Sequence, residues 1–342
     1  MLFHLHFSNT FCQLPFFRNS YLFVDFFFIL SGFVLVHSYA FRPNLGFGTF
    51  IKARTRRILP LHLCMLGLFI LLEVFRMEAG RSLITTNNLP FSGNTAPAEI
   101  LPNALLLQSW VPFAERLSWN YTSWSISVEY YVYILFYGTL LATTQFRRWI
   151  WGAILIAGAA LSLQAYRPES FRGMGEFFLG ALIYVAAKRS RMDLRLGRTV
   201  LGVLEWVVLI SIIALLSTEV AHRRVLSILV FGTTVFVYSS QAGWLSRFFR
   251  HRFFQHLGRI SYSIYLVHPA ILFLNIGLVM LLRHFLHLGS APFMEGVRFT
   301  NYSDGPLNNL AAILVVAIVI LLAGVTYRKI ECRWSGSTRK LA

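Results

Sequence analysis

Charge is scarce in this sequence. Aspartate and glutamate together number 14, and charged residues make up 13% of the 342 positions. A soluble domain carries roughly a quarter of its residues as charges. Hydrophobic residues fill 56% of the chain instead. This composition excludes an ordinary soluble fold and indicates that most of the chain lies in lipid.

Cysteine is scarce as well. Cys12, Cys64 and Cys332 are scattered, and each lies in or beside an apolar segment. Their spacing fits neither a metal site nor a disulfide framework, so we expect inert thiols and no bound metal. The first residues lack a basic region followed by a small-residue cleavage site, so we expect membrane insertion to rely on the spans themselves.

The net charge of +17 would also suit a nucleic-acid-binding protein. The lysines and arginines, however, lie in short loops between apolar runs, and no separate basic domain is visible. This placement is typical of membrane topology, so we expect no nucleic-acid partner.

Apolar runs long enough to cross a bilayer recur along the chain. They predict an all-α fold, a polytopic transmembrane helix bundle of about nine full spans. We expect one transmembrane domain over residues 1–342 with no internal repeat and no appended soluble domain. The expected spans cover residues 21–41, 58–75, 123–144, 149–164, 172–188, 200–217, 224–240, 260–282 and 307–327.

Two longer loops are expected on the external side. The loop 76–122 contains an apolar stretch, 100–111, that is too short to cross and that lies on the interface or re-enters the membrane. The loop 283–306 is polar and contains glycine and proline.

Orientation follows from the basic residues. Of 31 lysines and arginines, 21 fall in one alternating set of loops that includes the carboxyl tail, and this set is expected in the cytoplasm. The opening residues 1–7 resemble the last turns of a helix, so we expect a truncated first span; with that span present, both ends would be cytoplasmic.

Ionisable residues inside spans are candidates for function because lipid makes them costly. In the segment Ser123-Trp124-Ser125-Ile126-Ser127-Val128-Glu129, Ser125 and Glu129 are four residues apart and share one helix face. The alternative is structural: Ser123 caps a helix, and Glu129 pairs with a nearby arginine. Asp25, inside the first expected span, is a further candidate.

Arg54 and Arg57 are three residues apart at the cytoplasmic entry of a span. Guanidinium groups suit phosphates, so the pair fits a nucleotide-bearing donor such as coenzyme A. Ordinary positive-inside anchoring is the alternative, and for a basic cluster taken alone it is favoured.

Two other ionisable residues have structural alternatives. His268 precedes Pro269, which loosens the helix ladder, and a lone histidine there is more often a packing or hydrogen-bonding residue. Glu176 lies four residues after Arg172, which predicts a structural helix pair. His4 is the best base by chemistry, because a neutral imidazole accepts a hydroxyl proton.

Six segments in order along the chain carry a resemblance to a known family. They cover residues 2–4, 21–33, 54–60, 123–129, 176–180 and 261–268. Together they resemble the membrane acyltransferase-3 family, whose members add acyl groups to cell-surface glycans, and the resemblance spans nearly the whole chain. It implies that His4 matches the essential histidine, that Arg54 and Arg57 match an Arg-x-x-Arg pair, and that residues 123–129 match a Ser-Trp-Ser-x-Ser-x-Glu segment.

The resemblance also implies a substrate class and a location. The donor would be cytoplasmic acyl-CoA, commonly acetyl-CoA, with no permanently bound cofactor, and the acceptor would be a glycan or glycolipid such as lipopolysaccharide. The protein would lie in the inner, or plasma, membrane with its carboxyl end in the cytoplasm. The family's first helix would lie upstream of Met1, and Glu331-Cys332 replaces its usual Glu-Pro.

The expected mechanism follows from these roles. Arg54 and Arg57 hold the donor's phosphates, and His4 deprotonates the acceptor hydroxyl, which attacks the thioester. Glu129 orients His4 or stabilises its imidazolium, and Ser125 or Trp124 steadies the oxyanion.

Two rival classes stay open. A transporter or flippase also has many spans, although no symmetry between halves is visible here. A non-catalytic partner or an inactive truncated family member is the other alternative.

Overall fold

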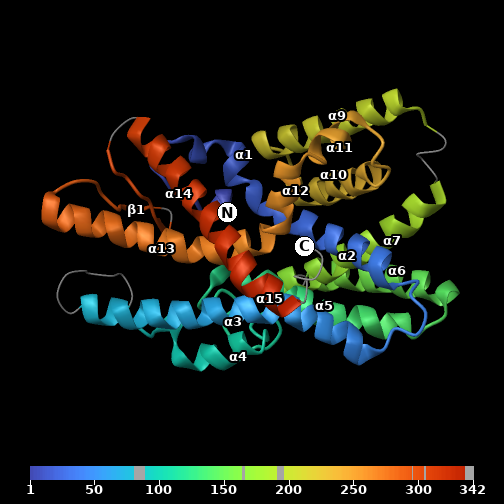
Figure 1. Ribbon diagram of the computed structural model, residues 1–342, viewed down its shortest axis with the longest axis horizontal. Coiled ribbons are helices and arrows are strands. Elements are labelled where there is room, and N and C mark those ends of the chain that lie inside the picture. Colours follow the sequence, from blue (N-terminus) through green and yellow to red (C-terminus); the bar gives the residue numbers. More distant parts are fainter. Residues whose placement is uncertain (81–88, 164–165, 191–195, 295, 304–305, 336–342) are drawn as a thin grey trace. The chain divides into compact units, whose positions relative to one another are not determined.

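The computed structural model describes residues 1–80, 89–163, 166–190, 196–294, 296–303 and 306–335 (Figure 1). The chain is mainly helical, as predicted. By length and composition, five helical segments of the described residues qualify as membrane spans, so this is a multi-pass membrane protein. The five segments are Pro15–Tyr39, Phe47–Glu78, Arg198–Ser217, Ser261–Leu286 and Pro306–Trp334.

These five segments match five of the nine predicted spans. Helices α5 (Trp124–Leu140), α6 (Thr144–Leu161), α7 (Pro168–Ser190) and α10 (Arg223–Tyr238) occupy the positions of the other four. Two of these four helices are only 17 and 16 residues long, α5 and α10 respectively. Nine spans therefore stay a prediction.

The chain divides into two compact units, and each is described by itself. The first unit comprises Met1–Arg18, Thr55–Ser127 and Arg259–Ala342, and the second comprises Asn19–Arg54 and Val128–Gly258. Helices α3 (Phe47–Gly80) and α5 run from one unit into the other. The prediction of a single domain is not tested by this division.

The first unit holds two complete long membrane helices, the larger part of α3, several short helical turns and a small hairpin. Apart from α3, its elements are η1 (Leu2–His4), η2 (Phe11–Gln13), α1 (Pro15–Arg18), η4 (Gly93–Thr95), η5 (Pro97–Glu99), α4 (Ile100–Ala104), η6 (Tyr121–Ser123), α13 (Ser261–Leu286), β1 (Phe293–Met294), β2 (Val297–Arg298), α14 (Pro306–Thr326), the π-helical turn η7 (Tyr327–Glu331) and α15 (Cys332–Ser335).

The hairpin is a local departure from the all-α prediction. Strands β1 and β2 are antiparallel, with Phe293 opposite Arg298 and Met294 opposite Val297. It lies in the predicted polar loop 283–306. The predicted interfacial stretch 100–111 is helical only over α4, because Leu106 adopts a left-handed backbone conformation with φ of 57°.

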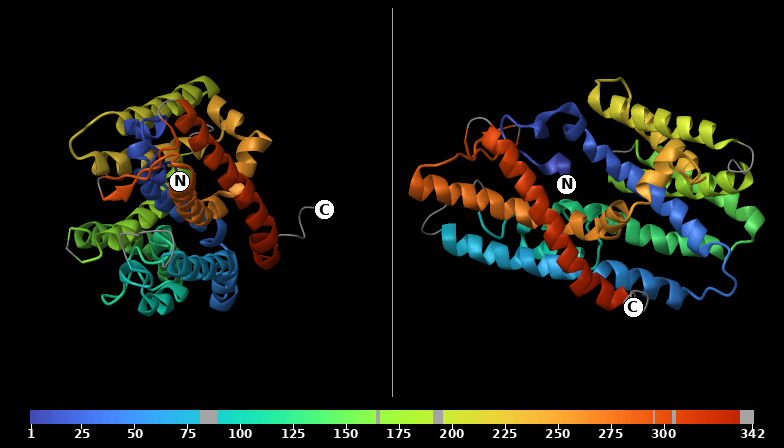
Figure 2. Two further views of the ribbon diagram at one scale, coloured as in Figure 1. Left: turned by 90° about the vertical axis from the view of Figure 1, so that its left-hand side faces the viewer. Right: turned by 45° about the horizontal axis from the view of Figure 1, so that its top comes forward.

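A hydrophobic core in the first unit anchors the amino-terminal segment. Leu5 and Phe7 are each 1% exposed and pack with Leu272 of α13 and with Ala312 and Val315 of α14. Helices α13 and α14 lie side by side, and the amino terminus lies beside them (Figure 2). Close van der Waals packing of these side chains holds the segment before α1 in place.

The second unit is a bundle of helices. Apart from α5, α6, α7 and α10, its elements are η3 (Ser20–Leu22), α2 (Phe23–Tyr39), α9 (Arg198–Ser217), α11 (Trp244–Phe249) and most of α12 (Arg252–Arg259).

Glycines allow the backbones of α2 and α7 to approach closely. A Cβ atom added to Gly180 of α7 would overlap the carbonyl of Ile29 in α2, and one added to Gly32 of α2 would overlap the carbonyl of Phe177. Small residues at such crossings are typical of membrane helices, which pack by close van der Waals contact. The Glu-Phe-Phe-Leu-Gly segment therefore positions α7 against α2.

We expect Gly180→Ala to lower the thermal stability of the purified chain, because the new methyl group meets backbone that has no room to move. The cost should be at least about 1–3 kcal/mol, as for other overpacked sites. Thermal unfolding in detergent measures it.

Gly138→Ala is the matched control, since Gly138 lies in helix α5 and a Cβ there meets no atom within 4 Å. Its melting temperature should equal or exceed that of the unaltered chain, because alanine favours helix. Equal melting temperatures for the two variants would contradict close α2–α7 packing.

Candidate active site

The segment that follows His4 is held by main-chain hydrogen bonds as well as by its buried side chains. The Ser8 amide donates to the Thr300 carbonyl at 3.0 Å, and the Thr300 amide donates to the His6 carbonyl at 2.7 Å. These bonds pair the opening residues with the segment just before α14. The position of His4 is therefore set by two elements from the far end of the sequence.

Pro269 explains how a loop comes to lie beside His268. A proline in a helix has no N–H for the carbonyl four residues earlier, here that of Tyr265. The Thr122 hydroxyl donates to this carbonyl at 3.1 Å. The Asn120 amide donates to the next one, that of Leu266, at 3.0 Å. These two hydrogen bonds hold η6 against α13.

Two histidines from opposite ends of the chain meet at this place. The ring of His4 stacks on that of His268, with centroids 5.4 Å apart and an interplanar angle of 29°. The ring centroid of Tyr121 lies 4.7 Å from that of His4 and 6.4 Å from that of His268. The ring centroid of Tyr265 lies 6.0 Å from that of His268. We refer to these four residues as the histidine cluster.

The hydrogen bonds of His268 define its tautomer. Its Nδ1 lies 3.1 Å from the Ile264 carbonyl, which only accepts, so Nδ1 carries the proton. Nε2 then holds a lone pair, is fully buried and has no hydrogen-bond partner among the residues with described positions. His268 thus combines the hydrogen-bonding role expected of it with an unsatisfied acceptor.

His4 is neutral at physiological pH. Burial is the largest cause of the shift and lowers the pKa of His4 to about 3. Burial also raises the pKa of Tyr121, which therefore stays protonated. The histidine cluster therefore contains the neutral imidazole of His4, whose unprotonated ring nitrogen is able to accept a proton.

Within the Ser-Trp-Ser segment, Ser125 is the residue that joins the cluster. Its hydroxyl lies 2.8 Å from the Tyr265 hydroxyl, and either oxygen is able to donate. Trp124 begins α5, and the guanidinium of Arg116 lies 5.1 Å from its ring centroid. Ser125 is therefore the better placed of the two predicted oxyanion donors.

Ser123 and Ser127 hold the loop together. The Ser123 hydroxyl donates to the Asn120 carbonyl at 2.7 Å, and that of Ser127 donates to the Leu106 carbonyl at 2.5 Å. The cap of the preceding turn is Asn120, whose side chain accepts from the Thr122 amide at 3.4 Å. The capping residue is therefore Asn120 and not Ser123, which was the structural alternative predicted from the sequence.

In the second unit, Glu129 lies in a separate cluster with Arg54. Glu129 Oε1 accepts a hydrogen bond from Ser31 at 2.7 Å and another from the Tyr133 hydroxyl. The guanidinium of Arg54 lies 5.9 Å from the Tyr133 ring centroid and donates to the Tyr39 hydroxyl at 2.6 Å. Tyr133 thus links Glu129 to Arg54.

Helix α3 begins at Phe47, so Arg54 and Arg57 lie about one turn apart on a continuous helix. Residues at this spacing share one helix face. Arg57 is exposed and Arg54 is half-buried. Arg54 Nε is buried and donates to no residue in the described ranges. The predicted pairing of Glu129 with His4 joins residues of different units and stays a prediction.

Asp25 and Glu176 share one cation in the second unit. Arg172 lies 3.2 Å from Asp25 Oδ1 and 3.3 Å from Glu176 Oε1. Both carboxylates are almost fully buried, at 2% and 3% exposure. The predicted Arg172–Glu176 pair is confirmed, and Asp25 joins it from α2.

The sequence interpretation missed Tyr121, Tyr133 and Tyr265. Tyr265 lies inside a recognised motif and the other two lie within a few residues of one, but a tyrosine in or near a motif gives no signal of its own. In the part of the chain that the structure describes, no group of three His, Cys, Asp or Glu side chains is placed to hold a metal ion.

Comparisons with known proteins bear on identity. A profile described as an acyltransferase domain matches residues 1–328. The chain is 43% identical over 68 residues to "Protein 2 in picA locus" of Rhizobium radiobacter, a match that spans 19% of this chain and 35% of that protein. No solved structure matches. With the profile covering nearly the whole sequence, the chain belongs to the membrane acyltransferase-3 family.

Proposed function

We propose that the protein is an O-acyltransferase of the inner membrane. It transfers an acyl group, which we propose is acetyl, from acyl-CoA to a hydroxyl of a carbohydrate or glycolipid. The observation that carries the proposal is the histidine cluster, in which the buried, neutral ring of His4 stacks on His268. Membership of an acyltransferase family supports the reaction class.

The proposed step conserves atoms and charge. His4 takes the proton of the acceptor hydroxyl while the hydroxyl oxygen attacks the thioester carbonyl carbon. The carbon–sulfur bond then breaks, and the proton passes to the departing thiolate, which yields the ester and free CoA. Ser125, hydrogen-bonded to Tyr265, is proposed to donate to the oxyanion that forms in between.

His268 is proposed as a positioning residue for His4. Its ring packs against that of His4, and its buried Nε2 holds a lone pair without a hydrogen-bond partner among the described residues. An imidazolium formed on His4 during the reaction would find that acceptor nearby. This arrangement provides for the proton without a carboxylate in the cluster.

Arg54 and Arg57 are proposed to bind the phosphates of the donor at the cytoplasmic face. Arg57 is exposed, and Arg54 keeps a donor nitrogen without a partner among the described residues. Guanidinium forks bind phosphates with two parallel hydrogen bonds. Glu129 is proposed to hold Arg54 in place through Tyr133.

We expect Arg54→Ala and Arg57→Ala to raise KM for acetyl-CoA by roughly tenfold to a hundredfold each, because each removes a charge-assisted hydrogen bond. The measurement is transfer of radiolabelled acetyl groups to membrane glycolipids by vesicles containing the full chain.

Arg56→Ala is the matched control, because Arg56 is an exposed arginine of the same helix outside the Arg-x-x-Arg pair. Its KM should stay within about twofold of the unaltered value. If all three variants behave alike, the arginines serve as membrane anchors and the donor assignment is wrong.

A further inference from the structure

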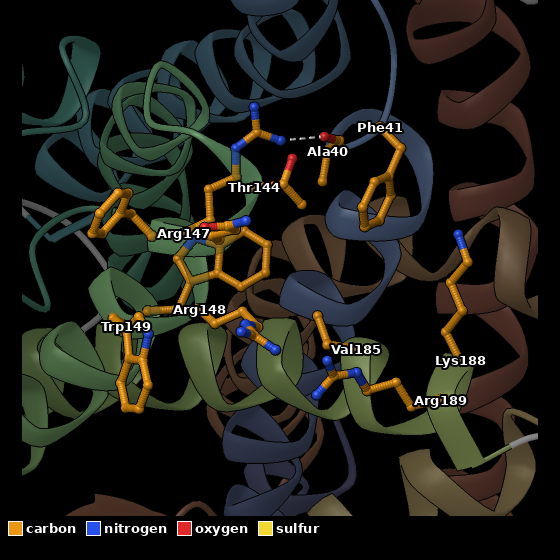
Figure 3. Close-up of a pocket in the computed structure, with 12 residues that line it drawn as sticks. Ala40, Phe41, Thr144, Arg147, Arg148, Trp149, Val185, Lys188 and Arg189 are labelled. Atoms are coloured by element: carbon orange, nitrogen blue, oxygen red, sulfur yellow. Dashed lines mark hydrogen bonds between the residues drawn. The ribbon is translucent and has the colours of Figure 1, made fainter.

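The second unit contains a cavity whose lining includes none of the residues assigned to acyl transfer. The loop after α2, the start of α6 and the end of α7 enclose a cavity of about 690 Å³ (Figure 3). This volume falls in the range of about 300–1,000 Å³ that is usual for small-molecule sites. We call it the basic pocket.

The basic pocket is lined by cations. Arg147 and Arg148 come from α6, and Lys188 and Arg189 come from the last turn of α7. No acidic residue with a described position lines it. Four positive charges around one cavity favour an anionic ligand.

Arg147 has a structural role in the pocket. It donates to the carbonyl of Ala142 at 2.9 Å, to that of Leu140 at 2.7 Å and to that of Ala40 at 2.5 Å. Figure 3 shows the last of these bonds. Arg147 thus ties the end of α5 to the end of α2 and forms one wall of the pocket.

The remaining cations are available to a ligand. Arg148 and Arg189 form no ion pair with any acidic residue of the described ranges, and both extend into the space between α6 and α7 (Figure 3). The Lys188 ammonium lies 4.5 Å from the ring centroid of Phe41. Two guanidinium groups and one ammonium suit the oxygens of a phosphate.

The aromatic residues of the pocket indicate where that phosphate lies. Phe41 is 48% exposed, Phe146 is 63% exposed and Trp149 is 74% exposed. The candidate span Pro15–Tyr39 ends directly before this loop. Exposed aromatic rings at the end of a span are typical of the membrane–water interface, the level of lipid headgroups.

From these observations we infer that the basic pocket binds the phosphodiester headgroup of an anionic phospholipid. Arg148, Lys188 and Arg189 contact the phosphate, and Phe41 and Trp149 lie against the glycerol and upper acyl chains. Basic pockets between membrane helices bind anionic headgroups by this combination of charge and position. A free phosphate-bearing molecule shares the charge but has no acyl chains that would place it at the level of the exposed rings.

The test is a binding titration of the purified full chain by native mass spectrometry, with phosphatidylglycerol as the probe and phosphatidylcholine as the neutral reference. Substitution of Arg148, Lys188 and Arg189 together by Gln should weaken phosphatidylglycerol binding roughly a hundredfold, or about 3 kcal/mol. Arg147 is left in place so that the helix ends stay tied.

The matched control replaces Arg247, Arg250 and Arg252, which are exposed in the same unit, by Gln. This variant removes the same charge and should retain binding. A third variant, Arg148→Lys with Lys188→Arg and Arg189→Lys, keeps the pocket's charge and should bind within a few fold of the unaltered chain.

Competition with free CoA separates the two sources of phosphate. The inference predicts that CoA leaves phosphatidylglycerol bound. Displacement by CoA would assign the pocket to a soluble ligand and overturn the inference. Equal loss of binding in the pocket and control variants, or retention in both, would overturn it too.

Discussion

Replacement of His4 by Gln should lower kcat for acyl transfer by about 10² to 10⁴, the usual contribution of a positioned general base. Glutamine keeps the size and polarity of the side chain but accepts no proton at physiological pH. The variant should therefore insert and purify normally while its turnover collapses. The measurement is the rate of label transfer from acetyl-CoA at saturating donor.

His284→Gln is the control for this substitution, because His284 is an exposed histidine near the end of α13 in the same unit. Its kcat should be unchanged within about twofold. If the His4 variant also keeps its kcat, the base lies elsewhere.

The pH profile gives a second readout of His4. With a pKa lowered to about 3, the ring keeps its neutral form as the pH falls, and kcat/KM should stay flat from pH 7 to pH 5. If the base were an ordinary histidine of pKa about 6.5, it would be protonated at pH 5, and kcat/KM would fall roughly thirtyfold. A loss of that size near pH 6 would contradict a buried, neutral base.

Arg172→Gln should prevent stable folding of the second unit. The change leaves Asp25 and Glu176, both nearly fully buried, without the cation that contacts them, although the charge of Arg224 also acts on both. Loss of one partner of a buried ion pair costs about 3–5 kcal/mol, because an uncompensated charge remains in the interior. The yield of monodisperse protein on size exclusion and its melting temperature measure this.

A triple variant isolates the cause. Arg172→Gln combined with Asp25→Asn and Glu176→Gln leaves no buried charge at this site, and it should recover much of the lost stability. If the triple variant is no more stable than Arg172→Gln alone, the arginine acts through packing and the electrostatic account is wrong.

The membrane character and the main helices were predictable because apolar runs mark the lipid-embedded part of a helix. Apolar runs do not mark the parts of a helix that extend beyond the lipid. Helix α3 was expected to begin near residue 58 but begins at Phe47, since Lys52, Arg54 and Arg56 are good helix formers that lower hydropathy. Its far end likewise continues to Gly80, into the predicted external loop.

The histidine cluster was only partly predictable. His4 and His268 were candidates for separate reasons, and nothing in their spacing indicated that the two rings stack. Their contact depends on Pro269, which frees the Tyr265 carbonyl for Thr122, and on Leu5 and Phe7, which bury themselves between α13 and α14. Contacts between residues more than 200 positions apart depend on packing that local sequence does not encode.

The most direct measurement of the central claim is mass spectrometry of surface glycans from cells that make either the unaltered chain or His4→Gln at equal membrane levels. We expect alkali-labile acyl esters on the glycans of the first cells and their loss in the second. Glycans without such esters in both, or with equal esters in both, would contradict acyl transfer by His4 and favour a transporter or a non-catalytic partner.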